Sequence, residues 1–278
     1  MNECDLLLVF GASFSNHTGI TPKKPTIQVD FDAMTLGKFH AIDVPLWGEI
    51  GITAGLLKGR LAGTTDTVDQ RPDMAERWQI WRREKKRRTE DDRDRGVNSA
   101  SIFAAMTRQV PEDAIIAVDV GNNTYSFGRY FECTRQAVLM SGYLGFIGFS
   151  YPAAMGAWAA TQEDDPRFKG RPVVAVSGDG GFGQYMGEIL TAVKYKMNIT
   201  HLLVHNDELG KISKEQRSGN WDVWKTSLHN PNFADYTNLC GGLGIRVTKK
   251  EELDDAIAKA LEYDGPSMVE VMADADLV

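Results

Sequence analysis

The strongest constraint on the fold is the alternation of short apolar segments with amphipathic segments between residues 98 and 278. The apolar segments are rich in Val, Ile and Leu, as buried parallel strands are. Strands that alternate with helices predict a doubly wound α/β fold, in which one parallel sheet carries helices on both faces. The expected strands are 114–120, 172–177, 200–205, 245–248 and 267–273, the expected helices are 99–110, 151–162, 188–197, 233–243 and 251–263, and the expected loops include 121–131 and 206–230.

Composition excludes several function classes. The chain has 278 residues, of which 42% are hydrophobic and 25% charged, as in globular proteins with a core. A net charge of -7 argues against nucleic acid or an anionic membrane as the main partner. No segment approaches the roughly 18 apolar residues of a membrane span, and no signal peptide is visible, so we expect a cytoplasmic protein. Cys4, Cys133 and Cys240 lie far apart, and we expect small core residues in a reducing compartment.

The first third of the chain lacks the regular alternation of strands and helices seen after residue 98. Residues 5–11 and 25–32 predict two buried parallel strands joined by a loop, and such strands need neighbours on both sides, so we expect only part of a domain here. From residue 63 to 97 the charges alternate in sign without an apolar stripe after Trp81. This pattern predicts a solvated linker with a charged helix, because the acidic residues argue against a nucleic-acid patch.

The stretch GDGGFG, residues 178–183, places Asp179 among glycines between a strand and a helix. Asn206 follows the next strand, and a right-handed crossover brings both side chains to one edge of the sheet. A carboxylate beside a helix N-terminus would repel a phosphate unless a divalent cation lay between them. Mg²⁺ prefers hard oxygen ligands. We therefore predict a Mg²⁺ site built from Asp179, the amide oxygen of Asn206 and the main-chain carbonyl of Glu208, with a diphosphate on the helix N–H groups.

These residues carry a resemblance to a known family. Gly178-Asp179-Gly180, the spacer, Asn206 and the segment NDELGKISKEQ resemble the signature of thiamine-diphosphate-dependent enzymes of the pyruvate oxidase and acetolactate synthase group. Residues 98–278 look like the thiamine-diphosphate-binding domain, and residues 1–62 look like the C-terminal part of the central Rossmann-like domain, with 63–97 as the linker. The resemblance implies thiamine diphosphate and Mg²⁺ as cofactors.

The resemblance also implies roles for individual residues. Ile147 matches the apolar wedge that bends the cofactor, and the carbonyl of Gly145 matches the acceptor for the aminopyrimidine. Glu215 is similar to a glutamate that reaches the reaction centre in pyruvate oxidases, where it exchanges protons with the intermediate, and Ile212 to an apolar substrate-facing residue. Ordinary alternatives are a core role for Ile147 and a solvated Glu215. The remaining cofactor contacts implied are Gly121, Asn122, Asn123, Gly178, Asp179, Gly180, Gly181, Asn206 and Gly210.

Two residues depart from the family pattern. His205 stands where the family often has asparagine, and Lys211 where it usually has a large apolar residue. Lys211 either attracts a carboxylate or phosphate of the substrate or is a solvated loop residue. The family also takes an activating glutamate from a pyrimidine-binding domain, which this sequence does not show. We therefore expect a C-terminal portion of a truncated, cleaved or split enzyme, inactive alone, whose remainder supplies that domain.

The activity implied is decarboxylation of a pyruvate-like 2-oxo acid and transfer of the hydroxyethyl unit. Glu215, and the lack of a tryptophan often seen nearby in synthases, favour a pyruvate oxidase or dehydrogenase, for which FAD is a candidate cofactor near Asp30 and Asp32. Alternatives are an acetolactate synthase-type carboligase, a non-catalytic cofactor-binding half and an unrelated nucleotide-binding domain. We expect a homo-oligomer, a dimer or tetramer, because the resemblance implies a site built across subunits.

Overall fold

The computed structural model describes residues 3–12, 23–63, 68–142 and 144–276. They form two compact units, Met1–Pro72 and Asp73–Val278. The middle of the first predicted loop, residues 13–22, and residues 64–67 of the charged segment lie outside the described residues.

The smaller unit contains a three-stranded parallel sheet of order β1-β2-β3. Its elements are β1 (Leu7–Phe10), β2 (Thr26–Asp30), β3 (Val44–Trp47) and α1 (Ile50–Leu61). The sequence predicted β1 and β2 but not β3 or α1, and its prediction that β1 is buried is wrong, because β1 lies at the edge of this sheet and Leu8 is exposed. The Glu49 carboxylate caps α1 by accepting a hydrogen bond from the amide of Ile52 at 2.6 Å. Among the described residues of α1 none is buried, and Ile52, Leu56 and Leu61 are exposed.

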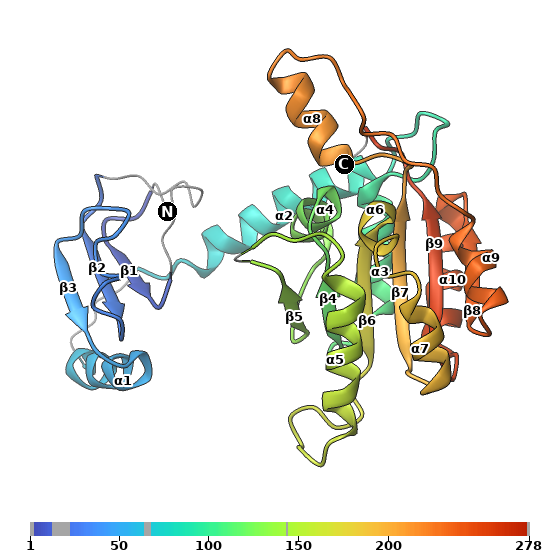
Figure 1. The fold of residues 1–278 in the computed structure, drawn as a ribbon. Coiled ribbons are helices and arrows are strands. Elements are labelled where there is room, and N and C mark those ends of the chain that lie inside the picture. The colour runs from blue at the N-terminus through green and yellow to red at the C-terminus, as the bar shows by residue number, and fades with distance from the viewer. Residues whose placement is uncertain (1–2, 13–22, 64–67, 143, 277–278) are drawn as a thin grey trace. The chain divides into compact units, whose positions relative to one another are not determined.

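The larger unit is built on a six-stranded parallel sheet of order β5-β4-β6-β7-β9-β8 (Figure 1). This confirms the predicted doubly wound architecture. The sequence missed only β5, a short and half-exposed edge strand. The strands are β4 (Ile115–Val118), β5 (Ala137–Met140), β6 (Val173–Gly178), β7 (Ile199–His205), β8 (Leu243–Val247) and β9 (Ser267–Met272).

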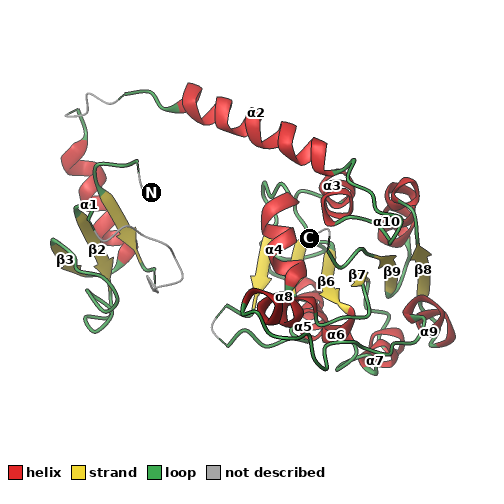
Figure 2. Cartoon of the chain, turned by 90° about the horizontal axis from the view of Figure 1, so that it is seen from above, coloured by secondary structure: helices red, strands yellow, loops and turns green. Residues whose placement is uncertain are grey.

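Helices cover both faces of this sheet (Figure 2). One hydrophobic core lies under α3, α4 and α10, with Phe103 and Ile257 among its members, and a second lies under α5, α7 and α9, with Ile189 and Phe233. The helices are α2 (Arg71–Arg88), α3 (Ser99–Gln109), α4 (Asn122–Tyr130), α5 (Ser150–Gln162), α6 (Asp179–Phe182), α7 (Glu188–Lys194), α8 (Gly210–Ser218), α9 (Phe233–Leu239) and α10 (Leu253–Glu262), the last preceded by the 3₁₀ turn η2 (Lys250–Glu252).

Two segments predicted as loops contain helices. Residues 121–131 contain α4 (Asn122–Tyr130), although its Asn, Thr, Ser and Gly residues are poor helix formers, because Phe127 and Tyr130 are buried in the core and packing overrides propensity. The predicted loop 206–230 contains α8, whose Ser213 is buried while most of its other residues are exposed or half-buried.

The charged segment is more ordered than a solvated linker. Its helix α2 packs through its second half onto the larger unit, where Trp81 stacks on Tyr130 at a centroid distance of 6.2 Å. Lys85 is buried and forms an ion pair with Glu132 at 3.1 Å, and Arg82 contacts the same carboxylate at 3.0 Å. The C-terminal half of α2 is therefore part of the larger unit.

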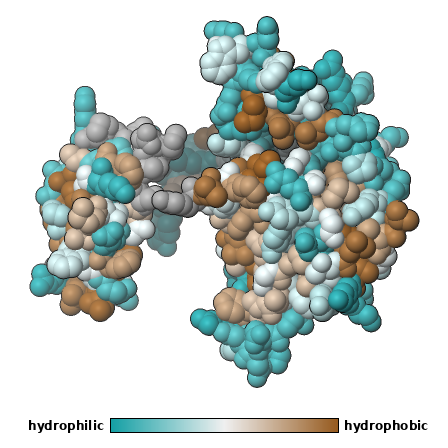
Figure 3. Space-filling model, in the orientation of Figure 1, coloured by the Kyte–Doolittle hydropathy of each residue, from teal (hydrophilic) through white to brown (hydrophobic). Residues whose placement is uncertain are grey.

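The remaining features are the character of the helices, the cysteines and the apolar residues at the surface. Within the described parts of the chain, no helix has the length and apolar character required to cross a membrane. Cys133 and Cys240 are free thiols. The prediction that the cysteines are core residues is wrong for Cys133, which is exposed after α4, whereas Cys4 is half-buried and the half-buried Cys240 packs against the core under α5, α7 and α9. On the face seen in Figure 3, apolar residues gather below the polar projection that contains α8.

Candidate functional site

The chain reverses its winding direction between β4 and β6. From β4 it crosses to β5 at one edge, and then returns to the other side of β4 to form β6 and β7. The loops that follow β4 and β6 therefore diverge and leave a crevice at the carboxyl ends of these strands, which is where open α/β sheets bind ligands. A cavity of about 270 Å³ occupies this position.

The cavity gathers the residues that the sequence singled out. Every predicted site residue except Glu215 lines it. These are Gly121, Asn122 and Asn123 after β4, Gly145 and Ile147 before α5, Gly178, Asp179, Gly180 and Gly181 after β6, and Asn206, Glu208, Gly210 and Ile212 after β7. Lys211, for which the sequence left open a place in the pocket or on the surface, also lines the cavity, and residues that the sequence did not single out include Ser99, Leu209 and Asp274.

Asp179 lines the cavity and is 2% exposed. Its Oδ2 accepts hydrogen bonds from the amide of Asp207 at 2.8 Å and from Nδ2 of Asn230 at 2.7 Å. Burial raises the pKa of Asp179, against the opposing effects of His205 and of the N–H groups around it. A buried carboxylate with a raised pKa is a site that a cation would stabilise.

The turn after β7 brings Asn206 and Glu208 to the same cavity. Asp207 adopts a left-handed conformation with φ of 56°, which reverses the chain between these two residues. The amide oxygen of Asn206 accepts a hydrogen bond from the amide of Glu208 at 3.1 Å. The turn therefore brings Asn206 and Glu208 to the cavity that Asp179 lines, and the amide of Asp207 ties it to the Asp179 carboxylate.

Three helices begin at the cavity: α4 after Gly121, α6 after Gly178 and α8 after Leu209. In the described chain no side chain caps the first turn of any of them, since glycine and leucine occupy the N-cap positions. Helix N-termini carry unpaired N–H groups and a partial positive charge. Their convergence makes the cavity suited to an anion.

Close backbone approach explains two of the glycines. A Cβ atom at Gly210 would lie 2.7 Å from Nδ2 of Asn122, and one at Gly181 would overlap Oδ2 of Asp119. Both contacts join loops from different strands, so any larger residue would force the loops apart.

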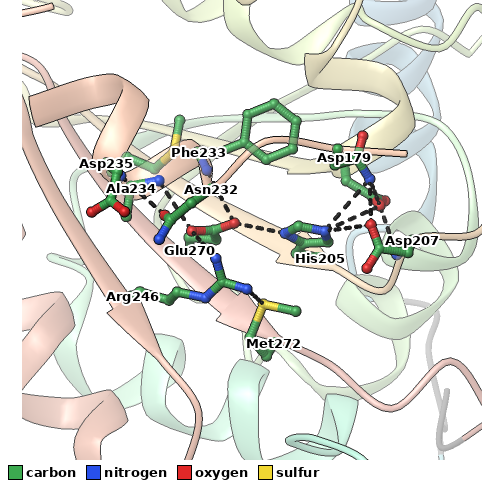
Figure 4. A network of polar contacts seen from close by, with 12 residues as sticks. Asp179, His205, Asp207, Asn232, Phe233, Ala234, Asp235, Arg246, Glu270 and Met272 are labelled. Atoms are coloured by element: carbon green, nitrogen blue, oxygen red, sulfur yellow. Dashed lines mark hydrogen bonds and ion pairs between the residues drawn. The ribbon is translucent and has the colours of Figure 1, made fainter. Parts of the chain in front are cut away.

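A polar network lies behind Asp179 (Figure 4). The imidazole of His205 contacts Glu270 through Nδ1 at 2.6 Å and Asp207 through Nε2 at 2.9 Å, and Nε2 lies 3.9 Å from Oδ2 of Asp179. Burial alone would lower the pKa of His205, but Glu270, Asp207 and Asp179 raise it above its ordinary value. The sequence marked His205 only as a departure and gave no role to Glu270 or Asn230, because nothing in their local pattern shows that they meet.

Glu215 lies outside the cavity lining, on the second turn of α8. Its exposed carboxylate forms an ion pair with the ammonium group of Lys211, one helical turn earlier, and that group also lies 5.5 Å from the centre of the Tyr125 ring. Glu215, which the resemblance placed at the reaction centre, is therefore paired with Lys211 beside the cavity.

Comparison with protein families gives two matches. The model of the C-terminal TPP-binding domain of thiamine pyrophosphate enzymes matches residues 119–271, and the model of their central domain matches residues 1–57. Thiamine pyrophosphate is another name for thiamine diphosphate. The first match covers the whole cavity lining except Ser99, Ala273 and Asp274.

Individual proteins show the same likeness. The thiamine pyrophosphate-containing protein YdaP of Bacillus subtilis is 33% identical over 98% of this chain and 46% of its own length. The large subunit of acetolactate synthase isozyme 2 of Escherichia coli is 26% identical over 99% of this chain and 48% of its own length. The chain thus spans about half the length of these curated relatives. The thiamine diphosphate-dependent 4-hydroxybenzoylformate decarboxylase of Rhodococcus jostii shares the fold over 99% of this chain and 50% of its own, with a TM-score of 0.76 and 20% identity.

Proposed function

The chain belongs to the thiamine pyrophosphate enzyme family, and on this basis we propose that it binds thiamine diphosphate with Mg²⁺ and takes part in decarboxylating a pyruvate-like 2-oxo acid, with transfer of the hydroxyethyl unit. One observation carries the proposal. Asp179 and Asn206 meet in a cavity at the switch point of the sheet, where three helices without side-chain caps begin.

The residues present fit both the metal and the diphosphate. Asp179 supplies a buried charge, while Asn206 and the carbonyl of Glu208 supply neutral oxygens, which is a donor set that Mg²⁺ accepts together with phosphate oxygens. The N-termini of α4 and α8 offer N–H groups for the phosphates, and Asn122 and Asn123 lie on the same wall.

When bound, thiamine diphosphate supplies the electron sink for loss of CO₂. The residues of the chain itself bind the cofactor and orient the cofactor and the substrate. The side chain of Ile147 and the carbonyl of Gly145 lie on the wall that faces the organic end of the cofactor in this proposal, where Ile147 fixes a folded conformation by steric contact. Ile212, which is 46% exposed at the cavity rim, offers an apolar contact to the substrate. Glu215 takes part in proton transfer only after it separates from Lys211.

The acyl acceptor decides between two activities. An electron acceptor gives a pyruvate oxidase or dehydrogenase, for which Glu215 was the sequence argument, and FAD would then bind the central domain. A second 2-oxo acid gives a carboligase, a reading supported by the names of several relatives, which are acetolactate synthase large subunits. In the smaller unit the carboxylates of Asp30 and Asp32 accept hydrogen bonds within their own turn, from Asp32 and Met34.

Partners follow from the same proposal. The activating glutamate and the other half of the cleft come from a pyrimidine-binding domain, either on another chain or on a longer form of this one. A homo-oligomer, a dimer or tetramer, would bring such domains together. The substrate is a small 2-oxo acid.

Calorimetric titration of thiamine diphosphate with Mg²⁺ into this chain tests the proposal. Binding should be lost in Asp179→Ala and kept in the control Asp254→Ala, whose carboxylate is paired with Arg108 at the surface. Tighter binding of ADP than of thiamine diphosphate would support an unrelated nucleotide-binding domain instead. Pyruvate turnover by the intact assembly, with and without added FAD and with acetolactate measured as product, separates the two activities.

A further inference from the structure

We propose that Asp119 is a positioning residue that holds the Gly145–Ile147 wall of the cavity in register with the wall formed by Gly178–Gly181. This inference rests on the proposed function, because it concerns how the organic end of thiamine diphosphate is held. Asp119 follows β4 and is absent from the cavity lining, so it acts through other residues.

Asp119 is joined to the loop before α5 through its carboxylate. Oδ1 accepts hydrogen bonds from the amides of Gly148 at 2.9 Å and Phe149 at 3.2 Å, and Oδ2 lies 3.0 Å from the same Gly148 nitrogen. Oδ1 also accepts the amide of Val120 at 2.8 Å. Ile147 directly precedes Gly148 and Phe149, so its position depends on the hydrogen bonds that these two amides donate to Asp119.

The loop has few other anchors. Leu144 is 79% exposed and Phe146 is 44% exposed, so their side chains contribute little burial. Gly145 and Gly148 both have positive φ, at 66° and 91°, which leaves the backbone many conformations before folding. Beyond the carboxylate, Ser141 accepts the amide of Gly145 on its carbonyl at 3.2 Å and that of Phe146 on its hydroxyl at 3.4 Å. Ser150 bridges β4 and β6 by donating to the carbonyl of Ala117 at 2.8 Å and accepting the amide of Val176 at 3.0 Å.

Asp119 also contacts the turn after β6 and the start of α4. A Cβ at Gly181 would overlap its Oδ2, so the turn after β6 is packed directly on the carboxylate. Its main-chain carbonyl accepts hydrogen bonds from Nδ2 of Asn123 at 3.0 Å and from the hydroxyl of Thr124. One residue therefore contacts three of the four segments that bring the predicted site residues to the cavity: its own loop after β4, the loop before α5 and the turn after β6.

Burying a carboxylate costs more free energy than burying an apolar side chain of the same size. Asp119 is 1% exposed, and among the described residues its carboxylate is bound by backbone N–H groups and by no cationic side chain. Hydrogen bonds to a charged acceptor are stronger than neutral ones, and they lose their geometry if either side moves. The arrangement fits a requirement for loop position better than a requirement for packing.

The test compares two probes on this chain and its variants. Thiamine diphosphate with Mg²⁺ reports on both ends of the cavity, whereas inorganic diphosphate with Mg²⁺ reports only on the phosphate end. Asp119→Ala should weaken thiamine diphosphate binding by about tenfold or more, as loss of an outer positioning partner does, and should weaken diphosphate binding far less. Asp119→Asn keeps one acceptor oxygen, so its affinity for thiamine diphosphate should lie between those of the unsubstituted chain and of Asp119→Ala. Ile147→Ala is the matched control and should show the same difference between probes.

Hydrogen exchange supplies a readout that needs no ligand. The amides of Gly148 and Phe149 should exchange faster in Asp119→Asn, while the amides of α7, away from the loop, should not change. Unchanged exchange at these two amides overturns the proposal, as does equal weakening of both probes, which would mean general collapse of the site. If the unsubstituted chain binds neither probe, the proposed function fails for this chain, and the exchange experiment still decides the role of Asp119.

Discussion

Nδ1 of His205 lies 2.6 Å from Oε1 of Glu270, in an interior where the Glu270 side chain has no exposure and that of His205 has 3%. The same carboxylate accepts the amides of Phe233 and Ala234, at 3.2 and 3.0 Å, where α9 begins. Burial would raise the pKa of Glu270, but His205 and these N–H groups lower it. The pair thus joins β7, β9 and α9 directly behind the candidate metal carboxylate.

Replacing His205 should strongly destabilise the larger unit. His205→Ala removes the nearer of the two cationic partners of the buried Glu270 carboxylate and leaves only Arg246, at 3.7 Å, so we expect a cost of up to about 3–5 kcal/mol. Urea unfolding followed by circular dichroism measures the loss. Arg108→Ala is the control: its ion pair with Asp254 is largely exposed, so the cost should be about 0–1 kcal/mol. Equal effects of the two substitutions would show that the buried pair is not important for stability.

The pair also makes stability depend on pH. The pKa of His205 in the folded chain is raised above its ordinary value of 6.5 by Glu270, Asp207 and Asp179, despite burial. The folded form therefore binds more protons than the unfolded form above pH 6.5. This contribution is complete below that pH and is lost as pH rises through the folded pKa, with a slope of up to about 1.4 kcal/mol per pH unit. Glu270→Gln should flatten this region of the stability profile; an unchanged slope would contradict the assignment.

Asp179→Asn should abolish Mg²⁺-dependent binding and stabilise the ligand-free chain. Burial raises the pKa of Asp179 above its ordinary value of 3.8, so its ionised form is disfavoured in the folded state. The substitution should gain about 0.5–2 kcal/mol at neutral pH, the usual range for removing a functional strain. The gain should shrink below pH 4, where the original carboxyl is protonated in both states. A variant that is less stable at pH 7 would contradict this.

Gly181→Ala and Gly156→Ala should have opposite effects. The first places a Cβ against the Asp119 carboxylate and should cost about 1–3 kcal/mol through overpacking. Gly156 lies inside α5, where a Cβ meets nothing within 4 Å, and alanine there should gain about 0.5–1 kcal/mol. Thermal unfolding of both variants checks the pair, and a neutral Gly181→Ala would show that the loops can move apart.

The sheet was predictable because its strands are buried on both faces and therefore read as continuous apolar runs. β5 was missed since Leu139 and Met140 are exposed at the sheet edge. α4 was missed because its stability comes from tertiary burial of Phe127 and Tyr130 and not from helix propensity.

The residues of the candidate site were predictable where they directly follow a strand that the sequence pattern shows. Asp179 and Asn206 each follow a strand, and strand order brings them together. Asn230 was missed because it comes from a distant loop, and its bond to Asp179 at 2.7 Å depends on the path of the chain around α8. The pairing of Lys211 with Glu215 depends on α8 being a helix, which the sequence had not indicated.

The residues that line the cavity are spread along almost the whole sequence of the larger unit, from Ser99 to Asp274. No isolated fragment of the sheet contains it, so a ligand that fills it binds only the completely folded unit. Such a ligand adds RT ln(1 + [L]/Kd) to the free energy of unfolding, about 2.7 kcal/mol at a hundredfold excess over Kd. The resistance of this chain to proteolysis should therefore follow the supply of its cofactor, so that the lifetime of the protein in the cell becomes a measure of how much cofactor is present.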